Sequence, residues 1–288
     1  MSRRHWFLFI TVGLLWGMPY LLLKVSVEEL SVPVIVCSRT LIGALVLVPI
    51  ALRQKTLLPA LKKYHYVLLY AILELFIPWL LITSAEQKIT SGLAGLLVAT
   101  VPIWTTVIAS VNGDKTVWHK KRLGGLLIGF IGVLLVVGIE SIRSDQNPLA
   151  ILMILVASLS YATAVATVTA TIPEIDPIAI NGLAMISAAI FFLPFALFAL
   201  PDQMPTAHVI ASQIALGLLP TAMAFILFFE LMRDVGPARA SLVTYLNTAF
   251  AVVLGVLILH EPLTLGIVVG LPLVLIGSYF AGRKSVTQ

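Results

Sequence analysis

The feature that most constrains this chain is a series of ten apolar runs, each long enough to cross a lipid bilayer. A helix rises about 1.5 Å per residue and the hydrocarbon layer is about 30 Å thick, so one crossing needs roughly 20 apolar residues. Only 11% of the 288 residues are charged and 60% are hydrophobic, whereas soluble domains have about 25% charged residues. Ten crossings use about 200 residues. The sequence therefore predicts an all-α membrane protein with no room for a soluble domain.

The breaks between the runs set the expected helix boundaries. The first run follows Arg3-Arg4-His5 and lacks a small-residue cleavage site, so we interpret it as the first membrane helix and not as a cleaved signal peptide. The expected spans are 6–24, 32–52, 65–85, 92–111, 123–140, 149–170, 178–199, 208–231, 237–259 and 263–281.

The distribution of Lys and Arg predicts the orientation. When alternate loops are assigned to opposite sides, 14 of the 18 basic residues fall on the side of the N-terminus and three on the other, and Arg39 lies inside a span. This bias predicts that both termini are cytoplasmic, in a bacterial-type inner (plasma) membrane. The loop with Glu174 and Asp176 has no basic residue and is the weakest point of the assignment. Because the basic residues flank the spans, the net charge of +5 does not indicate a nucleic-acid partner.

The chain also contains an internal repeat with an offset of 144 to 145 residues. It relates Trp16-Gly17 to Tyr161-Ala162 and Pro33 to Pro177. It also relates Glu86 and Lys88 to Glu230 and Arg233, and Gly125-Leu126 with Ile131-Gly132 to Gly270-Leu271 with Ile276-Gly277. A five-helix unit crosses the membrane an odd number of times, so its second copy must be inverted. We expect one integral membrane domain made of repeats 1–144 and 145–288, with a binding site near the midplane between them.

The short motifs of this chain and their order along it resemble those of the drug/metabolite transporter superfamily and its ten-helix EamA-like members. The resemblance spans nearly the whole chain. In the first half, Asp114 takes the place of Glu261 two residues out of register, which implies a small insertion. The residues that carry the resemblance are Trp16-Gly17, Lys24, Pro33, Ser38-Arg39, Pro102, and Glu261-Pro262-Leu263-Thr264 with Gly270 and Gly277.

The resemblance implies secondary transport of small metabolites, commonly the export of amino acids or drugs. Within the family the chain looks most like an amino-acid exporter, of the aromatic amino-acid type. A multidrug or organic-cation exporter of the same fold and a passive channel for small solutes are the alternatives. A membrane-embedded enzyme or receptor is a third class, for which the sequence has no recognisable catalytic constellation.

Two charged residues lie deep inside expected spans. A charge at the centre of a membrane helix costs roughly 2.5 to 3.5 kcal/mol on insertion scales, so such residues are expected to face the protein interior. Arg39 is a candidate partner for a substrate carboxylate. Glu74 is a candidate partner for an ammonium group or for a coupling proton. The competing interpretation is that the two side chains pair with each other or with backbone carbonyls.

Aromatic and polar side chains supply the remaining candidates for substrate binding. Trp16, Tyr20 and Lys24 share one helix face, and Lys24 lies near the outer boundary, where its ammonium group can simply reach the interface. Polar residues gather in the equivalent fourth and ninth helices, where helix packing is the competing interpretation. The predicted substrate-binding set is Trp16, Tyr20, Arg39, Glu74, Trp79, Thr100, Trp104, Tyr161, Tyr245 and Asn247.

Prolines and glycines within the spans indicate irregular helices and close helix contacts. Proline removes a hydrogen-bond donor and disturbs the carbonyl one turn earlier, so Pro78, Pro102 and Pro220 are candidate hinges or static kinks. Gly13 and Gly17 have the small-xxx-small spacing that allows helices to approach closely.

Several chemistries have no motif in the sequence. There is no G-x-x-x-x-G-K-[ST] loop for nucleotide binding, no H-E-x-x-H and no Cys/His cluster. Cys37 is the single cysteine. We therefore expect no enzyme activity, no cofactor and no metal. We also expect a monomer, whose partners are a small-molecule substrate and membrane lipid.

Overall fold

The structure is a computed structural model that describes residues 2–113, 120–143, 147–236, 240 and 243–282, and it is helical throughout the elements assigned there. Seven helical segments are long and apolar enough to cross a membrane, and three shorter apolar helices follow the same pattern. These segments coincide with the ten predicted spans. The expectation of an all-α membrane fold is confirmed.

The helices of the first half begin with α1 (Arg3–Ser26) and α2 (Val32–Arg53). A short helix that was not predicted, α3 (Leu57–Lys62), precedes the third span, which is built from α4 (Tyr64–Ala71), the π-helical turn η1 (Ile72–Phe76) and α5 (Ile77–Glu86). The fourth span consists of α6 (Ser91–Val98) and α7 (Val101–Val111), and the fifth is α8 (Lys120–Arg143).

The second half follows the same order. It begins with α9 (Pro148–Thr171) and α10 (Pro177–Phe198). The eighth span joins α11 (Ala207–Gly217), the π-helical turn η3 (Leu218–Met223) and α12 (Ala224–Val235). The last two spans are α14 (Val243–Ile258) and α15 (Leu265–Gly282).

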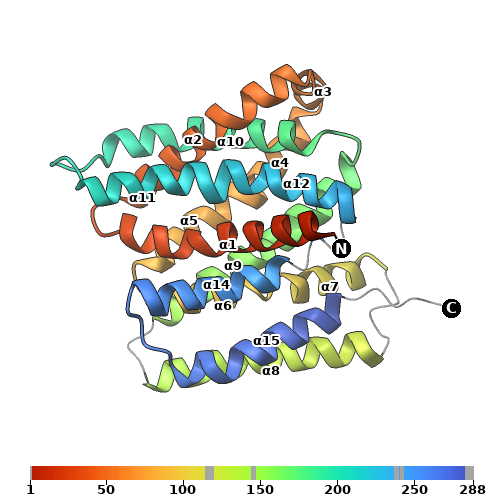
Figure 1. The fold of residues 1–288 in the computed structure, drawn as a ribbon, viewed down its shortest axis with the longest axis vertical. Helices are drawn as coiled ribbons and strands as arrows, with labels where there is room; N and C mark the ends of the chain where they lie inside the picture. The colour runs from red at the N-terminus through yellow and green to blue at the C-terminus, as the bar shows by residue number, and fades with distance from the viewer. Residues whose placement is uncertain (1, 114–119, 144–146, 237–239, 241–242, 283–288) are drawn as a thin grey trace.

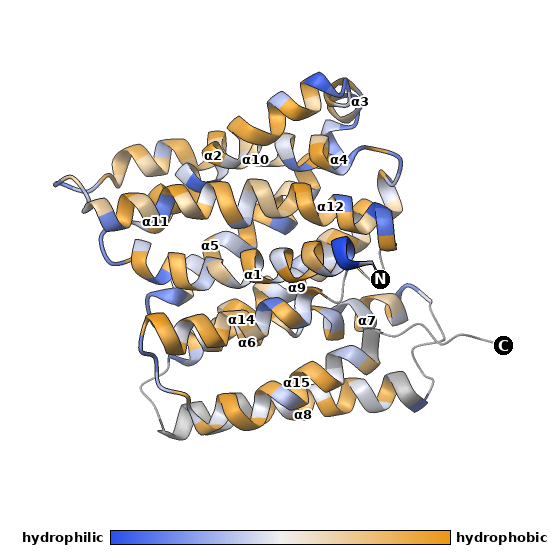
Figure 2. Cartoon of the chain, viewed as in Figure 1, coloured by the Kyte–Doolittle hydropathy of each residue, from blue (hydrophilic) through white to orange (hydrophobic). Residues whose placement is uncertain are grey.

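The long helices lie side by side, and α1 begins at the same end of the bundle at which α15 ends (Figure 1). We call this the amino-terminal end, and the end where α5 stops and α6 starts the distal end. The helices are apolar along most of their length and hydrophilic near their ends (Figure 2). Large apolar side chains such as Leu45 and Leu257 are more than 65% exposed. Such an exposed apolar surface is typical of a protein whose surroundings are lipid.

The contacts between the helices can be compared with the predicted repeat. The most extensive helix contacts join α2 to α10 and α8 to α15, which are two pairs of repeat-equivalent helices. Helix α1 packs on α14, and its counterpart α9 packs on α6 and α7. The contact of the first span with the ninth therefore has an equivalent contact of the sixth span with the fourth.

The third and eighth spans each contain a π-helical turn at equivalent positions, starting at Ile72 and at Leu218. Pro78 follows the first turn and Pro220 lies inside the second. Proline has no N–H group, so the regular hydrogen-bond ladder is interrupted at these points. Turns of this kind occur frequently at functional sites.

The predicted span 92–111 is confirmed as the membrane-crossing segment Ser91–Val111, and its helix is interrupted at one point. Helix α6 ends at Val98, and α7 begins at Val101. Pro102, at the start of α7, has no N–H group to donate to the carbonyl one turn earlier. Within the break, the hydroxyl of Thr100 donates to the Leu97 carbonyl oxygen at 2.7 Å.

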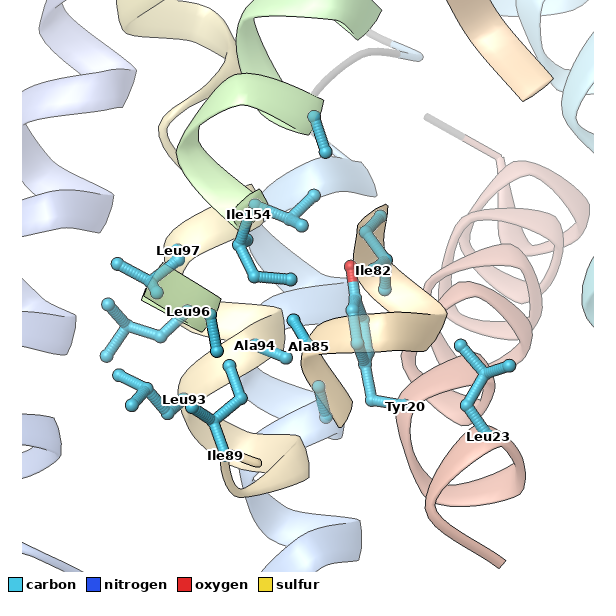
Figure 3. Close-up of a cluster of buried hydrophobic side chains, with 14 of the residues drawn as sticks. Tyr20, Leu23, Ile82, Ala85, Ile89, Leu93, Ala94, Leu96, Leu97 and Ile154 are labelled. Carbon is cyan, nitrogen blue, oxygen red and sulfur yellow. The ribbon is translucent and has the colours of Figure 1, made fainter. Parts of the chain in front are cut away.

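A cluster of buried apolar side chains fills the distal half of the bundle between α1, α5, α6 and α9. Tyr20 lies beside Ile82 and Ala85 in this cluster, with its hydroxyl at the edge of the packed group (Figure 3). The cluster holds α1 against the third and fourth spans. It thereby fixes the position of the aromatic face of α1 that the sequence singled out.

The close contact between α1 and α14 generates a stability prediction. A Cβ atom at residue 17 would lie 2.6 Å from Cβ of Phe250 and 2.9 Å from the Asn247 carbonyl oxygen. We therefore expect Gly17→Leu to separate the two helices and to lower the melting temperature of the purified protein. Gly124→Leu is the matched control, because no atom lies within 4 Å of the added Cβ there. Equal melting temperatures for the two variants would contradict the predicted contact.

Candidate functional site

Arg39 of α2 lies at the centre of the candidate site and is only 7% exposed. Its Nε atom donates a hydrogen bond to Oγ1 of Thr221 at 2.8 Å. Its guanidinium carbon lies 3.6 Å from the centroid of the Trp79 ring. Thr221 belongs to η3 and Trp79 to α5, so this single guanidinium group connects three spans from both halves.

The guanidinium group has no carboxylate partner among the described residues. The ion pairs found there involve Arg4 and His5 instead, and no ion pair joins Arg39 to Glu74. Within the same residues, the terminal nitrogens Nη1 and Nη2 of Arg39 donate to no protein group. The interpretation in which Arg39 and Glu74 neutralise each other by direct contact is therefore wrong.

Glu74 lies in η1, on the neighbouring span. Its Oε2 atom is enclosed and has no hydrogen-bond partner among the described residues. Tyr161 of α9 interacts electrostatically with both Glu74 and Arg39, and its hydroxyl also interacts with Trp79. Both side chains therefore lie within electrostatic range of the Tyr161 hydroxyl.

The π-helical turn in the eighth span positions the hydroxyl that holds Arg39. Pro220 has no N–H group and leaves the carbonyl of Leu216 without its usual helical donor. The hydroxyl of Thr221 donates to this carbonyl at 2.8 Å and accepts from Nε of Arg39. The irregular backbone and the charged side chain are therefore connected through one oxygen atom.

Three further hydrogen bonds link the two halves. Tyr70 of α4 donates its hydroxyl to Oδ1 of Asn181 in α10 at 3.2 Å. Gln213 of α11 donates through Nε2 to the Ser38 hydroxyl at 2.8 Å and to the Ile35 carbonyl at 2.9 Å. Sequence reasoning missed Tyr70, Asn181 and Gln213, because single uncharged polar side chains in apolar spans carry no pattern that identifies their partners.

Tyr20 and Tyr161 join the centre that the sequence predicted. Tyr20 is 6% exposed and interacts electrostatically with Tyr161 and Arg39. Trp79 is 4% exposed. The side chains around Arg39 thus fill the middle of the bundle in this conformation, where the sequence predicted an open pocket.

The remaining predicted residues lie outside the group of side chains around Arg39. Trp16 packs on Phe225 and Phe228 of α12, with ring centroids 5.8 and 4.6 Å apart. Tyr245 lies against Tyr279 of α15, and the indole nitrogen of Trp104 is enclosed without a partner among the described residues.

Two of the predicted polar residues make local contacts. Thr100 donates to its own helix. Asn247 accepts from its neighbour Thr248 at 3.2 Å. The geometry therefore brings Arg39, Glu74, Trp79, Tyr20 and Tyr161 together, and it gives Trp16, Thr100, Trp104, Tyr245 and Asn247 separate contacts.

Lys24 does not simply extend to the membrane surface. Its Nζ atom donates to the backbone carbonyls of Glu86 at 2.7 Å and Ile89 at 2.8 Å, which ties α1 to the turn between α5 and α6. Glu86 itself is completely buried. Glu74 is therefore not the one deep carboxylate that the sequence indicated, because the expected span ended just before Glu86.

The predicted hinges lie where the helices are irregular. Pro78 follows η1, Pro220 is within η3, and Pro102 begins α7 after the break in the fourth span. Whether these positions move remains a prediction. Asp114, the expected counterpart of Glu261, lies outside the described residues.

Comparison with known proteins assigns a family to this arrangement. The sequence profile of the EamA-like transporter family matches the chain twice, over residues 4–138 and 148–283. The Bacillus subtilis protein YoaV, described as an uncharacterized transporter, is 29% identical over 285 residues, which cover 96% of this chain and 97% of that protein.

Two further comparisons extend over nearly the full length. The Escherichia coli protein YedA, described as an uncharacterized inner membrane transporter, is 27% identical over 95% of this chain and 91% of its own length. A crystal structure of a protein that is 18% identical superposes with a TM-score of 0.68 over 98% of this chain and 97% of that one. This last likeness concerns the fold.

The contact between Arg39 and Thr221 generates a prediction about stability. Thr221→Val keeps the shape of the side chain but removes the oxygen that accepts from Arg39 and donates to Leu216. A hydrogen bond to a charged group contributes about 1.5 to 3 kcal/mol, so we expect a clearly lower melting temperature. Thr221→Ser retains the hydroxyl and should melt close to the parent protein. A Val variant that melts like the Ser variant would show that the hydrogen bond does not stabilise the site.

Proposed function

Because the chain belongs to the EamA-like transporter family, we propose that it is a secondary transporter that exports amino acids with apolar, mainly aromatic, side chains by alternating access. In this proposal the chain works in a bacterial inner membrane as a monomer, with both termini in the cytoplasm. Residues 1–144 and 145–288 act as the two inverted repeats that rock against each other around the Arg39 region.

The observation that carries the proposal is the uncompensated charge of Arg39. This buried cation is held by Thr221 and Trp79, and its two terminal nitrogens donate to no described protein group. It lacks only an anionic partner. A carboxylate fits a guanidinium group with two parallel hydrogen bonds. This charge favours an amino acid over the alternative substrate class of organic cations, which Arg39 would repel.

The remaining groups of the substrate find complementary side chains nearby. Glu74, with its enclosed and unpartnered Oε2 atom, accepts the ammonium group. Trp79, Tyr161 and Tyr20 provide aromatic surfaces for an apolar side chain. Few polar groups within an apolar surround are typical of small-molecule sites. In this proposal Trp16, Thr100, Trp104, Tyr245 and Asn247 contact the substrate only in other conformations of the cycle.

The source of energy is either the substrate gradient or proton exchange at Glu74. A carrier of this kind must change conformation for each molecule that it moves, and the irregular backbone at Pro78, Pro102 and Pro220 provides positions at which the helices bend. A channel would need a continuous pathway. In the described structure, the middle of the bundle is filled by Arg39, Trp79 and Tyr20, which favours the carrier.

The direct test is counterflow of labelled phenylalanine in proteoliposomes. If the protein is a carrier, proteoliposomes loaded with unlabelled phenylalanine accumulate the labelled phenylalanine transiently. A channel only equilibrates the label, and an enzyme changes the labelled compound chemically. If unlabelled tetraphenylphosphonium abolishes this accumulation and unlabelled amino acids do not, the organic-cation exporter is favoured. Absence of counterflow with every common amino acid would reject the proposed substrate class.

Arg39→Gln should abolish counterflow of phenylalanine, because the neutral amide cannot replace the guanidinium group that faces the carboxylate. Arg53→Gln, at the exposed end of the same helix, is the matched control and should transport normally. Melting temperatures of both variants show whether the fold is retained. A folded Arg39→Gln variant with unaltered transport would remove Arg39 from the site.

Glu74→Gln should give slow transport that varies less with pH, because the part of the pH dependence that comes from Glu74 is lost. In the parent protein, protonation of Glu74 at low pH removes the charge that accepts the ammonium group, so the transport rate should rise as the pH is raised. The exposed residue Glu174 supplies the control variant Glu174→Gln, which should keep the parental pH profile. A Glu74→Gln protein with the parental profile would show that Glu74 carries no coupling proton.

A further inference from the structure

The distal end of the bundle contains a second deep carboxylate, that of Glu86. This residue is the last one of α5, its side chain is completely buried, and neither carboxylate oxygen has a hydrogen-bond partner among the described residues. An ionised carboxylate without partners is strongly disfavoured in a buried setting. The carboxyl end of a helix disfavours negative charge further. A neutral carboxylic acid is the form that these surroundings accommodate.

A cation lies close to this carboxylate but is bound elsewhere. The ammonium group of Lys24 interacts electrostatically with Glu86, yet it donates to the backbone carbonyls of Glu86 and Ile89. Both residues line a cavity of about 320 Å³, together with Val27, Glu28 and Gln87. Water in this cavity can therefore lie close to the buried Glu86 carboxyl group.

The other ionisable groups facing Glu86 are Tyr20 of α1 and Glu261 of the connection between α14 and α15. The Glu261 carboxylate accepts from the backbone N–H of Ser91 at 2.7 Å, from its hydroxyl at 2.8 Å and from the N–H of Gly92 at 3.1 Å. It therefore caps the first turn of α6. This contact joins the second half to the first at the distal end.

The inverted repeat provides an internal comparison. Glu230 of α12 is the counterpart of Glu86, and it forms an ion pair with Arg4 of α1 at the amino-terminal end. Arg4 also pairs with Asp234 at 2.8 Å. Helix α1 therefore offers a basic side chain to each of the two equivalent glutamates, and the ion pair is formed at one end only.

From this asymmetry we propose that Glu86 is a proton-binding residue of the transport cycle and that Lys24 is the counter-charge which replaces the proton. In the described conformation, Glu86 holds a proton and Lys24 holds the turn between α5 and α6. The proposal does not depend on which molecule is transported.

Release of the proton changes two contacts at the distal end. The proton passes to water in the cavity, and Glu86 becomes a carboxylate. The ammonium group of Lys24, which keeps its own protons, moves to this carboxylate and leaves the Ile89 carbonyl. The new negative charge also repels the Glu261 carboxylate, which caps α6. Both changes loosen α6 from α1 and α5, so the distal end opens as the pH rises.

The test uses a reporter cysteine and no substrate. Cys37, the single native cysteine, is replaced by alanine, and Ala85→Cys places a small thiol beside Glu86 at a position that is completely buried in this structure. The labelling rate with a hydrophilic maleimide is measured in nanodiscs from about pH 5.5 to about pH 8.5, a range in which a buried carboxyl group can titrate. Each rate is divided by that of Asp202→Cys, an exposed position at the same end, to correct for thiol ionisation.

We expect the normalised labelling rate of Ala85→Cys to rise several-fold with pH. Adding Glu86→Gln, which imitates the protonated acid, should keep the rate low at every pH. Adding Lys24→Met removes the contact with the two carbonyls and should give a high rate throughout. Glu28→Gln, an exposed residue beside the same cavity, should leave the rise with pH unchanged.

A flat labelling profile in the parent background overturns the proposal, and so does a rise that persists in the Glu86→Gln variant. The melting temperature of each variant identifies any that fails to fold, and the parental profile then remains decisive. Because no substrate is added, failure here is separate from failure of phenylalanine counterflow, which tests the proposed function.

Discussion

The structure depends on the contacts that hold the positively charged Arg39 side chain in the interior of the helix bundle. A charged side chain inside a membrane helix is tolerated when it faces the protein interior and finds polar partners. Arg39 meets this condition through the hydroxyl of Thr221 and the ring of Trp79. Cation–π contacts contribute about 2 kcal/mol or more when desolvated. Since Thr221 comes from the second repeat, the same contacts that stabilise the charge also hold the two halves together.

Irregular helices and charged side chains occur together in this fold. The π-helical turns of the third and eighth spans contain Glu74 and Thr221, respectively. A proline that interrupts the hydrogen-bond ladder follows the first turn and lies inside the second. Irregular backbone inside a membrane is tolerated only within protein or next to water. The turns thus belong to the interior, and they place polar atoms from both halves next to Arg39. Tight glycine contacts, such as that of Gly17 with α14, supply the rigid surroundings.

Much of the fold follows from the sequence, because long apolar runs and the repeat admit few arrangements. Arg39 and Glu74 were identifiable as deep charges within apolar runs. Thr221, Tyr70 and Asn181 were not, because an uncharged polar side chain in a span can bond its own helix or pack in the core without any role in a site. The burial of Glu86 was not predicted, because boundaries read from hydropathy are uncertain by several residues. The contacts of Trp16 and Tyr245 depend on helix rotation, which spacing alone does not determine. Only coordinates could show that Lys24 binds carbonyls in place of a carboxylate.

The claim at the centre of this account is that Arg39 receives the carboxylate of the transported molecule. The most direct measurement is an experimental structure determined with bound 4-bromophenylalanine, in which the anomalous signal of bromine locates the ligand independently of the protein. The account predicts a carboxylate within hydrogen-bonding distance of the terminal nitrogens of Arg39, with the bromophenyl ring near Trp79 and Tyr161. A fully occupied ligand elsewhere, with the guanidinium group of Arg39 still unpaired, would contradict it.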